Sequence, residues 1–405
     1  MKKTLSLLLS AAMAVMCFAG CNSGNSTSSS SASGSSASSS SDSASDAGAS
    51  VPSSSLESSA PEDAGTITVI DHADREVILP KEVNRVVVAD VYPMASVLAV
   101  FLGSADKLVG IHPVCMSAAK NGLLGELFPE ILEADTGFMT GSDLNIEELM
   151  KLEPDVVFCT AANSTLISAL ENAGITAVGI SPSKFQYDIL ETYDQWIALL
   201  SQIFPESDKA EAISKYSREI YDRIQQKVAS LPEEERKKVL FLFQYDETQM
   251  VTSGRNFFGQ FWCEAVGAVN AAEEVAADNS NAVITMEQVY GWDPDLIFIT
   301  NFTPTQPADL MGNKVGADDW STVKAVQNGE VYKLPLGTYR SYTPSSDTPV
   351  TLLWMAQKVY PDLFEDVDMT AEVRDYYQEL YGVALTDEQI GRMYNPASAG
   401  AESFR

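Results

Sequence analysis

The chain has 405 residues, a formal net charge of −30 and only two histidines. Phosphate backbones and anionic lipid surfaces repel so acidic a chain, so the charge excludes nucleic acid as a partner but suits docking onto a basic protein. Two histidines also disfavour metal sites built from several imidazoles.

The N-terminal residues have the layout of a secretory signal peptide. Lys2 and Lys3 precede an apolar run over residues 5–18, and small residues follow before Cys21. This run is too short for a comfortable membrane helix. The sequence "FAGC" is similar to a lipobox, although Phe18 stands where leucine is usual. We therefore expect a signal peptide over residues 1–20 and a lipid, such as palmitate, on Cys21; the alternative is an ordinary secreted protein with an incidental cysteine.

A serine-rich tract follows Cys21. Residues 22–65 are mostly Ser, Ala, Gly and Asp, with almost no large apolar side chain. Such a segment cannot bury enough surface to offset its ordering entropy. We expect residues 21–65 to be a flexible tether with a root-mean-square span of roughly 35–40 Å. No later apolar run reaches membrane-spanning length.

The remaining body contains a duplication. "NIEELMKLEPDVVFCT" (residues 145–160) aligns with "TMEQVYGWDPDLIFIT" (residues 285–300). In each copy an N-cap candidate begins a short helix, a Pro-Asp turn ends it, and a continuous apolar run predicts a buried strand. Other apolar runs, at residues 85–93, 173–182, 238–246 and 329–337, alternate with helical patterns at residues 95–102, 165–172, 257–266 and 348–359.

This alternation of strands and helices predicts an α/β fold with parallel sheets in two lobes. We place the lobes at residues 66–205 and 232–395, followed by a tail at 396–405. Between them, apolar residues recur at helical spacing through residues 206–231, with Ser207 as N-cap and Pro232 as terminator. About 24 helical residues span roughly 36 Å, so one backbone helix is expected to join the lobes and to permit only small rocking.

Ligands of open α/β sheets bind outside the carboxyl ends of the strands, and two facing lobes would place both sets of ends on one cleft. The loops at these ends carry aromatic residues and two arginines, which suit a medium-sized polar chelate or macrocycle. The candidate ligand-binding residues are Tyr92, Phe138, Met139, Asn163, Tyr245, Arg255, Phe257, Asn301, Phe302, Tyr339, Arg340 and Tyr342.

Three cysteines remain in the body: Cys115, Cys159 and Cys263. Their spacing matches no metal motif, and three thiols allow at most one disulfide. We expect small buried apolar residues, with a disulfide left open.

These segments resemble the substrate-binding proteins of ABC importers for ferric siderophores, cobalamin and haem. The resemblance rests on "VIDHADREVILPKEVNRVVVAD", "NIEELMKLEPDVVF", "DWSTVKAVQNGEVYKLP", "LLWMAQKVYPDLF" and "VRDYYQELYG", and covers most of residues 67–392. Asp74 stands where the family usually has glycine. The resemblance implies two α/β lobes joined by one helix, and it favours Phe138 and Arg340 as ligand contacts.

The resemblance also implies docking onto a permease through one acidic residue per lobe. In the first lobe the matching position is Glu147. In the second it falls near Val269, which is not acidic, so Glu264 or Glu273 are substitutes to consider. The expected protein is a monomer, anchored by lipid on the extracytoplasmic face of the cell membrane.

The sequence limits the class of ligand but does not identify the compound. A ferric siderophore is the simplest expectation for the ligand. We expect a weakly charged siderophore, because the loops carry only two cations, Arg255 and Arg340, and the anionic Asp90 and Asp246 are nearby. Cobalamin or haem capture is the alternative, with His112, Tyr92 or Met139 as possible axial ligands of haem. No cofactor is expected.

Two remoter hypotheses carry little support. A binding site for a bare zinc or manganese ion would need more imidazole ligands than His72 and His112 provide. A serine hydrolase would use the Ser-x-x-Lys pattern, which occurs four times without the accompanying Lys-Thr-Gly. We therefore expect a binding protein and not an enzyme.

Overall fold

The computed structural model describes residues 65–141, 143–275 and 282–401. The described residues all belong to one compact unit of the chain. The predicted signal peptide, the lipidation site at Cys21 and nearly all of the predicted tether lie outside the described residues. In the part of the chain that the structure describes, no helix is both long and apolar enough to cross a bilayer.

The described chain opens with an antiparallel hairpin, β1 (Thr66–Ile70) and β2 (Glu76–Pro80). Its turn is held by Asp71, whose Oδ1 accepts hydrogen bonds from the backbone N–H groups of Ala73 and Arg75. Asp74 has a φ of 59°, a left-handed conformation that favours glycine. The aspartate found where the family usually has glycine therefore keeps the glycine-like backbone, at a cost of about 1 kcal/mol.

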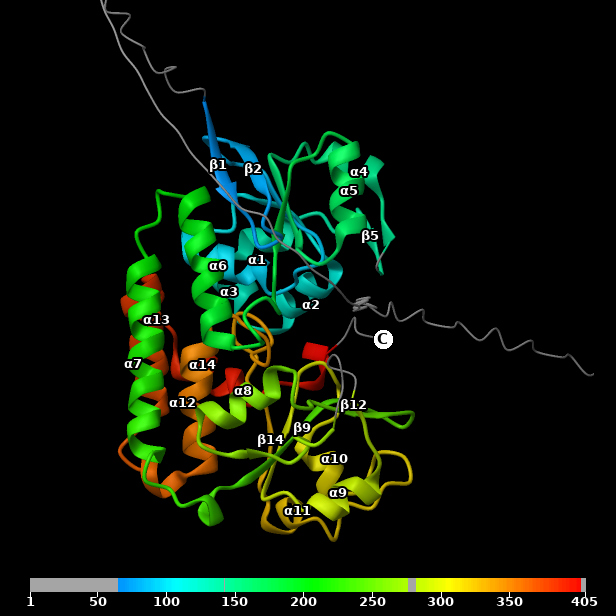
Figure 1. The fold of residues 1–405 in the computed structure, drawn as a ribbon, viewed down its shortest axis with the longest axis vertical. Coiled ribbons are helices and arrows are strands. Elements are labelled where there is room, and N and C mark those ends of the chain that lie inside the picture. The colour runs from blue at the N-terminus through cyan, green and yellow to red at the C-terminus, as the bar shows by residue number, and fades with distance from the viewer. Residues whose placement is uncertain (1–64, 142, 276–281, 402–405) are drawn as a thin grey trace, which may run out of the picture. The chain divides into compact units, whose positions relative to one another are not determined.

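The first sheet, which defines lobe one, is wholly parallel, in the order β4-β3-β7-β8 (Figure 1). Its strands are β3 (Val86–Val88), β4 (Leu108–Ile111), β7 (Val156–Thr160) and β8 (Ala177–Ile180). The connections contain α1 (Met94–Leu102), α2 (Pro113–Asn121), α3 (Leu124–Leu127), η1 (Pro129–Glu133), the two-residue strands β5 (Met139–Thr140) and β6 (Asp143–Leu144), α4 (Ile146–Lys151) and α5 (Ser164–Asn172).

The second sheet defines lobe two, and it runs β12-β10-β9-β13-β14 with β11 also paired to β9. Its strands are β9 (Lys238–Tyr245), β10 (Met250–Thr252), β11 (Val269–Asn270), β12 (Ala282–Val283), β13 (Leu296–Ile299) and β14 (Val331–Lys333). Its connections contain η2 (Glu233–Glu235), α8 (Phe258–Ala265), α9 (Met286–Trp292), α10 (Pro307–Met311) and α11 (Lys324–Asn328).

Lobe two departs from the parallel sheet predicted by the sequence at one edge. β10 pairs antiparallel with both β9 and β12. The hairpin between β9 and β10 is closed by Asp246, whose Oδ1 accepts hydrogen bonds from the N–H groups of Thr248 and Gln249. This turn has no glycine or proline, the usual markers of a hairpin, so the sequence pattern did not reveal it.

The connection between the lobes consists of two helices, α6 (Ile189–Ile203) and α7 (Ala210–Val228). Ile213 of α7 packs in the core of lobe one, whereas Ile220 and Ile224 pack in the core of lobe two, so α7 spans both. Figure 1 shows α7 alongside α12 (Thr348–Val359) and α13 (Met369–Tyr381). The chain then continues from α12 through η3 (Pro361–Phe364) to α13, and from α13 to α14 (Asp387–Met393) and η4 (Ser398–Ala401).

The α7 helix is shorter than the predicted span of 206–231. It begins at Ala210 because Ser207 does not cap it. The Ser207 hydroxyl instead donates a hydrogen bond to the Phe101 carbonyl of lobe one, at 2.8 Å. Nineteen helical residues still extend about 28 Å, enough to reach both cores.

The predicted duplication is visible in the backbone of the two lobes. Glu153 and Asp293 occupy equivalent positions, and their φ angles are 44° and 45°. The next aspartates, Asp155 and Asp295, each accept a hydrogen bond at 2.8 Å from the backbone N–H that starts the neighbouring strand, at Arg85 and Lys238 respectively. The Pro-Asp turn therefore ends a helix and also fixes the register of the adjacent strand in both lobes.

The three body cysteines confirm the simpler expectation. Cys115, Cys159 and Cys263 are all buried and none forms a disulfide. Burial raises the pKa of the Cys115 and Cys159 thiols to about 12, so both stay protonated and unreactive at neutral pH.

Candidate functional site

The segment that follows α2 in lobe one contacts the loop at the carboxyl end of β14 in lobe two. The backbone N–H of Leu123, which follows α2 in lobe one, donates to the carbonyl of Gly337 in lobe two at 2.7 Å. Gly337 lies in the long loop between β14 and α12, which carries Tyr339 and Arg340. The loop predicted to bear the main cation therefore lies against lobe one.

At this contact, side chains from both lobes gather around one buried arginine. We define the interlobe cluster as Tyr92, His112, Cys115, Phe302, Tyr339 and Arg340. In lobe one, the Tyr92 and His112 rings lie 4.7 Å apart, and the Cys115 thiol donates to the Tyr92 carbonyl at 3.1 Å. Burial raises the pKa of the Cys115 thiol to about 12, and the positive charge of Arg340 across the interlobe contact partly offsets this rise.

Arg340 is fully buried. Its Nε donates a hydrogen bond to the carbonyl of Gly400 at 3.0 Å. Its guanidinium carbon lies 5.5 Å from the Phe302 ring centroid and 5.7 Å from that of Tyr339, within the range of a cation–π interaction. A guanidinium between aromatic rings can bind an anionic oxygen bidentately while the rings cover the rest of a ligand.

His112 has a structural task at the start of α2. Its Nδ1 accepts a hydrogen bond from the Val114 N–H at 3.1 Å, and its Nε2 lies 3.0 Å from the Gly141 carbonyl, to which it donates. Burial lowers the pKa of His112, which keeps the ring in this neutral form. Because both ring nitrogens are engaged, His112 is not poised as an axial ligand of haem.

Two predicted residues, Arg255 and Phe257, lie in a different place. They line a surface pocket of about 510 Å³ together with Gln186, Tyr187 and Asp188 of the loop that follows β8. The Tyr187 ring lies 5.2 Å from the Phe257 ring, and Arg255 is exposed and 3.6 Å from Glu273. The sequence analysis missed Tyr187; its left-handed φ of 60° could not be inferred from residue type.

Three further predicted residues are engaged in holding loops of lobe two. The Tyr245 hydroxyl donates to Asp318 and accepts from the Trp320 indole, both at 2.8 Å. Asn301 donates its side-chain amide to the carbonyls of Leu334 and Pro335. Tyr342 is fully buried in the core of lobe two. The hydrogen bonds of Tyr245 and Asn301 thus hold loops of lobe two, and Tyr342 contributes to its core.

The remaining predicted residues lie in lobe one. Phe138 is fully buried in the apolar core and Met139 is 6% exposed, so neither ring nor thioether faces an open site in this conformation. Asn163 caps α5 by accepting from the Leu166 N–H, and its amide donates to Asp90 at 2.8 Å. Ligand contact by these three residues stays a prediction.

The acidic positions expected to meet a permease lie on the surface. Glu147 is exposed in the first turn of α4. Its counterpart in the duplicated segment is Glu287, exposed in the first turn of α9. The alignment of the two repeats pairs Glu147 with Glu287, and which acidic residue of lobe two meets a permease stays a prediction.

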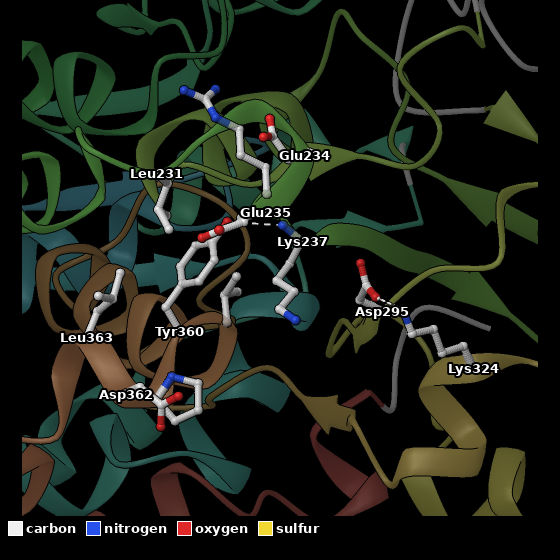
Figure 2. A pocket seen from close by; sticks show the side chains of 12 residues that line it. Leu231, Glu234, Glu235, Lys237, Asp295, Lys324, Tyr360, Asp362 and Leu363 are labelled. Atoms are coloured by element: carbon white, nitrogen blue, oxygen red, sulfur yellow. Dashed lines mark hydrogen bonds and ion pairs between the residues drawn. The ribbon is translucent and has the colours of Figure 1, made fainter.

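A pocket of about 550 Å³ lies elsewhere on lobe two (Figure 2). It includes Lys237 and Asp295, the residues just before β9 and β13, so it lies at the amino ends of these strands, away from the interlobe cluster. Its polar groups already bond to one another: Lys324 forms an ion pair with Asp295 at 2.5 Å, and the Tyr360 hydroxyl accepts a hydrogen bond from the Lys237 N–H. Size alone therefore does not make it the ligand site.

Among the described residues, no group of three or more His, Cys, Asp or Glu side chains could hold a metal ion.

Comparison with known proteins agrees with this architecture. The family model for periplasmic binding proteins matches residues 86–336, well over half of the chain. The chain belongs to the periplasmic binding protein family. These proteins bind solutes, and the matched region contains both sheets and most of the interlobe cluster.

Two curated proteins and one solved structure illustrate the relationship. The chain is 24% identical to the molybdate-binding protein MolA of Haemophilus influenzae, over 84% of this chain and 97% of that one. It is 25% identical to the Fe(3+)-citrate-binding protein YfmC of Bacillus subtilis, over 64% and 78%. A periplasmic solute-binding protein of Veillonella parvula is 30% identical in structure-based alignment, with a TM-score of 0.72, covering 84% of this chain and all of the other.

Proposed function

We propose that this protein is the extracytoplasmic solute-binding component of an ABC importer, and that it captures a metal complex between its two lobes. The observation that carries this proposal is the buried guanidinium of Arg340, set between the Phe302 and Tyr339 rings where loops of both lobes meet. A buried cation with aromatic walls suits a compact ligand that presents anionic oxygens.

A ferric chelate, most simply a siderophore, is the first candidate for that ligand. Its iron is already wrapped by oxygen ligands, so the protein has to recognise only the outer surface of the complex. The interlobe cluster contributes the single cation of Arg340, which favours a chelate of low net charge. Similarity to a protein named for binding ferric citrate supports the iron-chelate class.

A compact oxyanion is the second candidate, because the aromatic rings and the guanidinium of the interlobe cluster are almost completely shielded from solvent. Tyr339 is 2% exposed, Phe302 is 7% exposed and Arg340 is fully buried, which leaves little room for a bulky ligand without rearrangement. The similarity to a protein named for binding molybdate spans most of both chains. Haem is less well supported, because both nitrogens of His112 are already bonded.

Delivery requires an anchor and a docking surface. We propose that Cys21 carries a lipid, and that Glu147 and its counterpart Glu287 meet basic residues of the permease. Replacing Cys21 with alanine should release the protein from the membrane fraction and abolish fatty-acid labelling. A Cys21→Ala variant that stayed equally membrane-bound and labelled would contradict the anchor.

The ligand proposal is tested by titrating the purified protein with ferric hydroxamate and catecholate siderophores, ferric citrate, molybdate, cobalamin and haemin, followed by tryptophan fluorescence. We expect one class to bind at micromolar concentration or tighter. Arg340→Gln should weaken that binding by about 10- to 100-fold, because a charge-assisted hydrogen bond contributes about 1.5–3 kcal/mol. Arg218→Gln, at an exposed arginine of α7, is the matched control and should change it little. Equal binding by the Arg340→Gln variant would contradict the assignment.

A further inference from the structure

The last described segment of the chain, which was expected to be a simple tail, returns to the interlobe cluster. After α14, residues 396–401 run back between the lobes and end in the 3-10 turn η4, which contacts α2 of lobe one (Figure 1). Just before it, the carbonyl of Met393 accepts a hydrogen bond from the Leu336 N–H of lobe two at 2.9 Å. We call residues 396–401 the C-terminal strap.

The strap makes a specific contact with the arginine of the cluster. The Gly400 carbonyl accepts the Nε hydrogen bond of Arg340 at 3.0 Å. Ala401 is only 4% exposed, and Arg340 is fully buried. The strap thus touches a helix of lobe one and the cation of lobe two at once, and a backbone oxygen occupies a donor that an anionic ligand would use.

The composition of the strap indicates that it is held weakly. Its sequence, "PASAGA", has no side chain larger than proline, so it buries little apolar surface. Segments with few buried apolar contacts open at low free energy compared with the core. In contrast, the helix before it, α14, places Ile390 and Met393 in the core of lobe one.

We propose that the C-terminal strap is an internal competitor for the ligand: it seals Arg340 in the unliganded protein and is displaced when a ligand binds. Ligand affinity is then reduced by the free energy needed to release the strap. The ligand part rests on the function proposed above, whereas the sealing of Arg340 does not, so the two are tested by separate measurements.

Two variants disturb the strap in different ways. A stop codon after Asn395 removes it. Gly400→Val crowds it, because a Cβ at Gly400 would lie 2.5 Å from the Cδ2 of the buried Leu336. Gly391→Val is the matched control, since a Cβ at this exposed position of α14 meets nothing within 4 Å.

The first measurement needs no ligand. Each protein is treated with phenylglyoxal, and the modification rates of Arg340 and of exposed Arg255 are followed by mass spectrometry. We expect Arg340 to react far more slowly than Arg255 in the wild type and the Gly391→Val control, and at least ~5-fold faster in both strap variants. Thermal melts identify any variant that has lost its fold. In that case the labelling rate of Arg340 in the other strap variant decides whether the strap seals this residue.

The second measurement titrates the same proteins with ferric citrate and with molybdate. If either probe binds, we expect at least ~5-fold tighter binding by the strap variants than by the wild type. If neither binds to any variant, ferric citrate and molybdate are excluded as the ligand, while the labelling still decides the sealing. Slow labelling of Arg340 in both folded strap variants, or weaker binding by them, would overturn the proposal.

Discussion

At the scale of single residues, Asp347 organises the loop that presents Tyr339 and Arg340. Its carboxylate is fully buried and accepts hydrogen bonds from the N–H groups of Thr338 and Tyr339, and from the hydroxyl of Tyr377 on α13. Burial raises the pKa of Asp347, because a charged carboxylate in the interior loses its hydration. The hydrogen bonds from these donors offset part of that free-energy cost. The loop is thereby tied to a helix that packs in the core of lobe one.

Removing this carboxylate should be costly. We predict that Asp347→Ala lowers the free energy of unfolding by about 3 kcal/mol, because it leaves several buried donors without an acceptor. Urea denaturation followed by circular dichroism measures the change. Asp106→Ala, at an exposed loop aspartate, is the control and should fall within about 0.5 kcal/mol of wild type. An Asp347→Ala protein as stable as this control would contradict the role of Asp347.

His112 gives the fold a defined pH dependence. Burial lowers its folded pKa below the ordinary 6.5, and the same is true of His72, whose Nδ1 accepts from the Ser181 N–H. In the window between each folded pKa and 6.5 the unfolded chain binds more protons than the native one, so stability falls as the pH drops through that window.

We predict that His112→Asn makes the loss of stability below pH 6.5 shallower. Asparagine can still cap α2 but does not titrate. Urea midpoints measured between pH 5 and pH 8 give the slope for each protein. We expect the number of protons taken up on unfolding to fall by up to one. An unchanged slope would mean that His112 is not held neutral in the folded protein.

At the scale of elements, the Pro-Asp turns of the two repeats perform the same task. Asp155 accepts from the N–H groups of Asn84 and Arg85, and Asp295 accepts from that of Lys238 and pairs with Lys324. Each aspartate joins the start of one strand to the start of its neighbour. The duplication is therefore preserved in backbone contacts as well as in residue identity.

Both turns should contribute similarly to stability. We predict that Asp155→Ala and Asp295→Ala each cost about 1–2 kcal/mol, and that the double variant costs the sum within about 0.5 kcal/mol, because they belong to different lobes and share no partner. Urea denaturation of the four proteins completes the cycle. A double variant far from additive would show that the two turns act on one element.

Much of this element structure followed from the sequence because continuous apolar runs and Pro-Asp turns are local signals. The strands at 156–160 and 296–299 and the helix at 348–359 appeared where the patterns predicted them. β10 and η4 were missed, because the Asp246 turn has no glycine or proline and "PASAGA" has no hydrophobic period.

The candidate site was predictable in residue type but not in arrangement. The sequence indicated Tyr339 and Arg340 as loop residues of lobe two, but only tertiary contacts show that Arg340 lies over the Phe302 ring and donates to the Gly400 carbonyl. In the same way, an aromatic residue such as Phe138 carries no local mark that distinguishes a core position from a ligand contact.

At the scale of the molecule, α7 packs against the cores of both lobes along its length. A helix embedded in this way resists bending, so the lobes are expected to rock slightly and not to open widely. Access to the buried cluster then depends on small rearrangements of loops, among them the proposed release of the strap. The fold places one buried cation, Arg340, in the loop of lobe two that contacts lobe one.

Native mass spectrometry of the protein purified from its own cells tests this account most directly. We predict that part of the protein retains a small metal complex, identified by its mass and metal isotope pattern, and that Arg340→Gln carries none. A wild-type mass matching the bare chain in every preparation, still unchanged after incubation with ferric chelates and molybdate, would contradict the proposal that the interlobe cluster captures a metal complex.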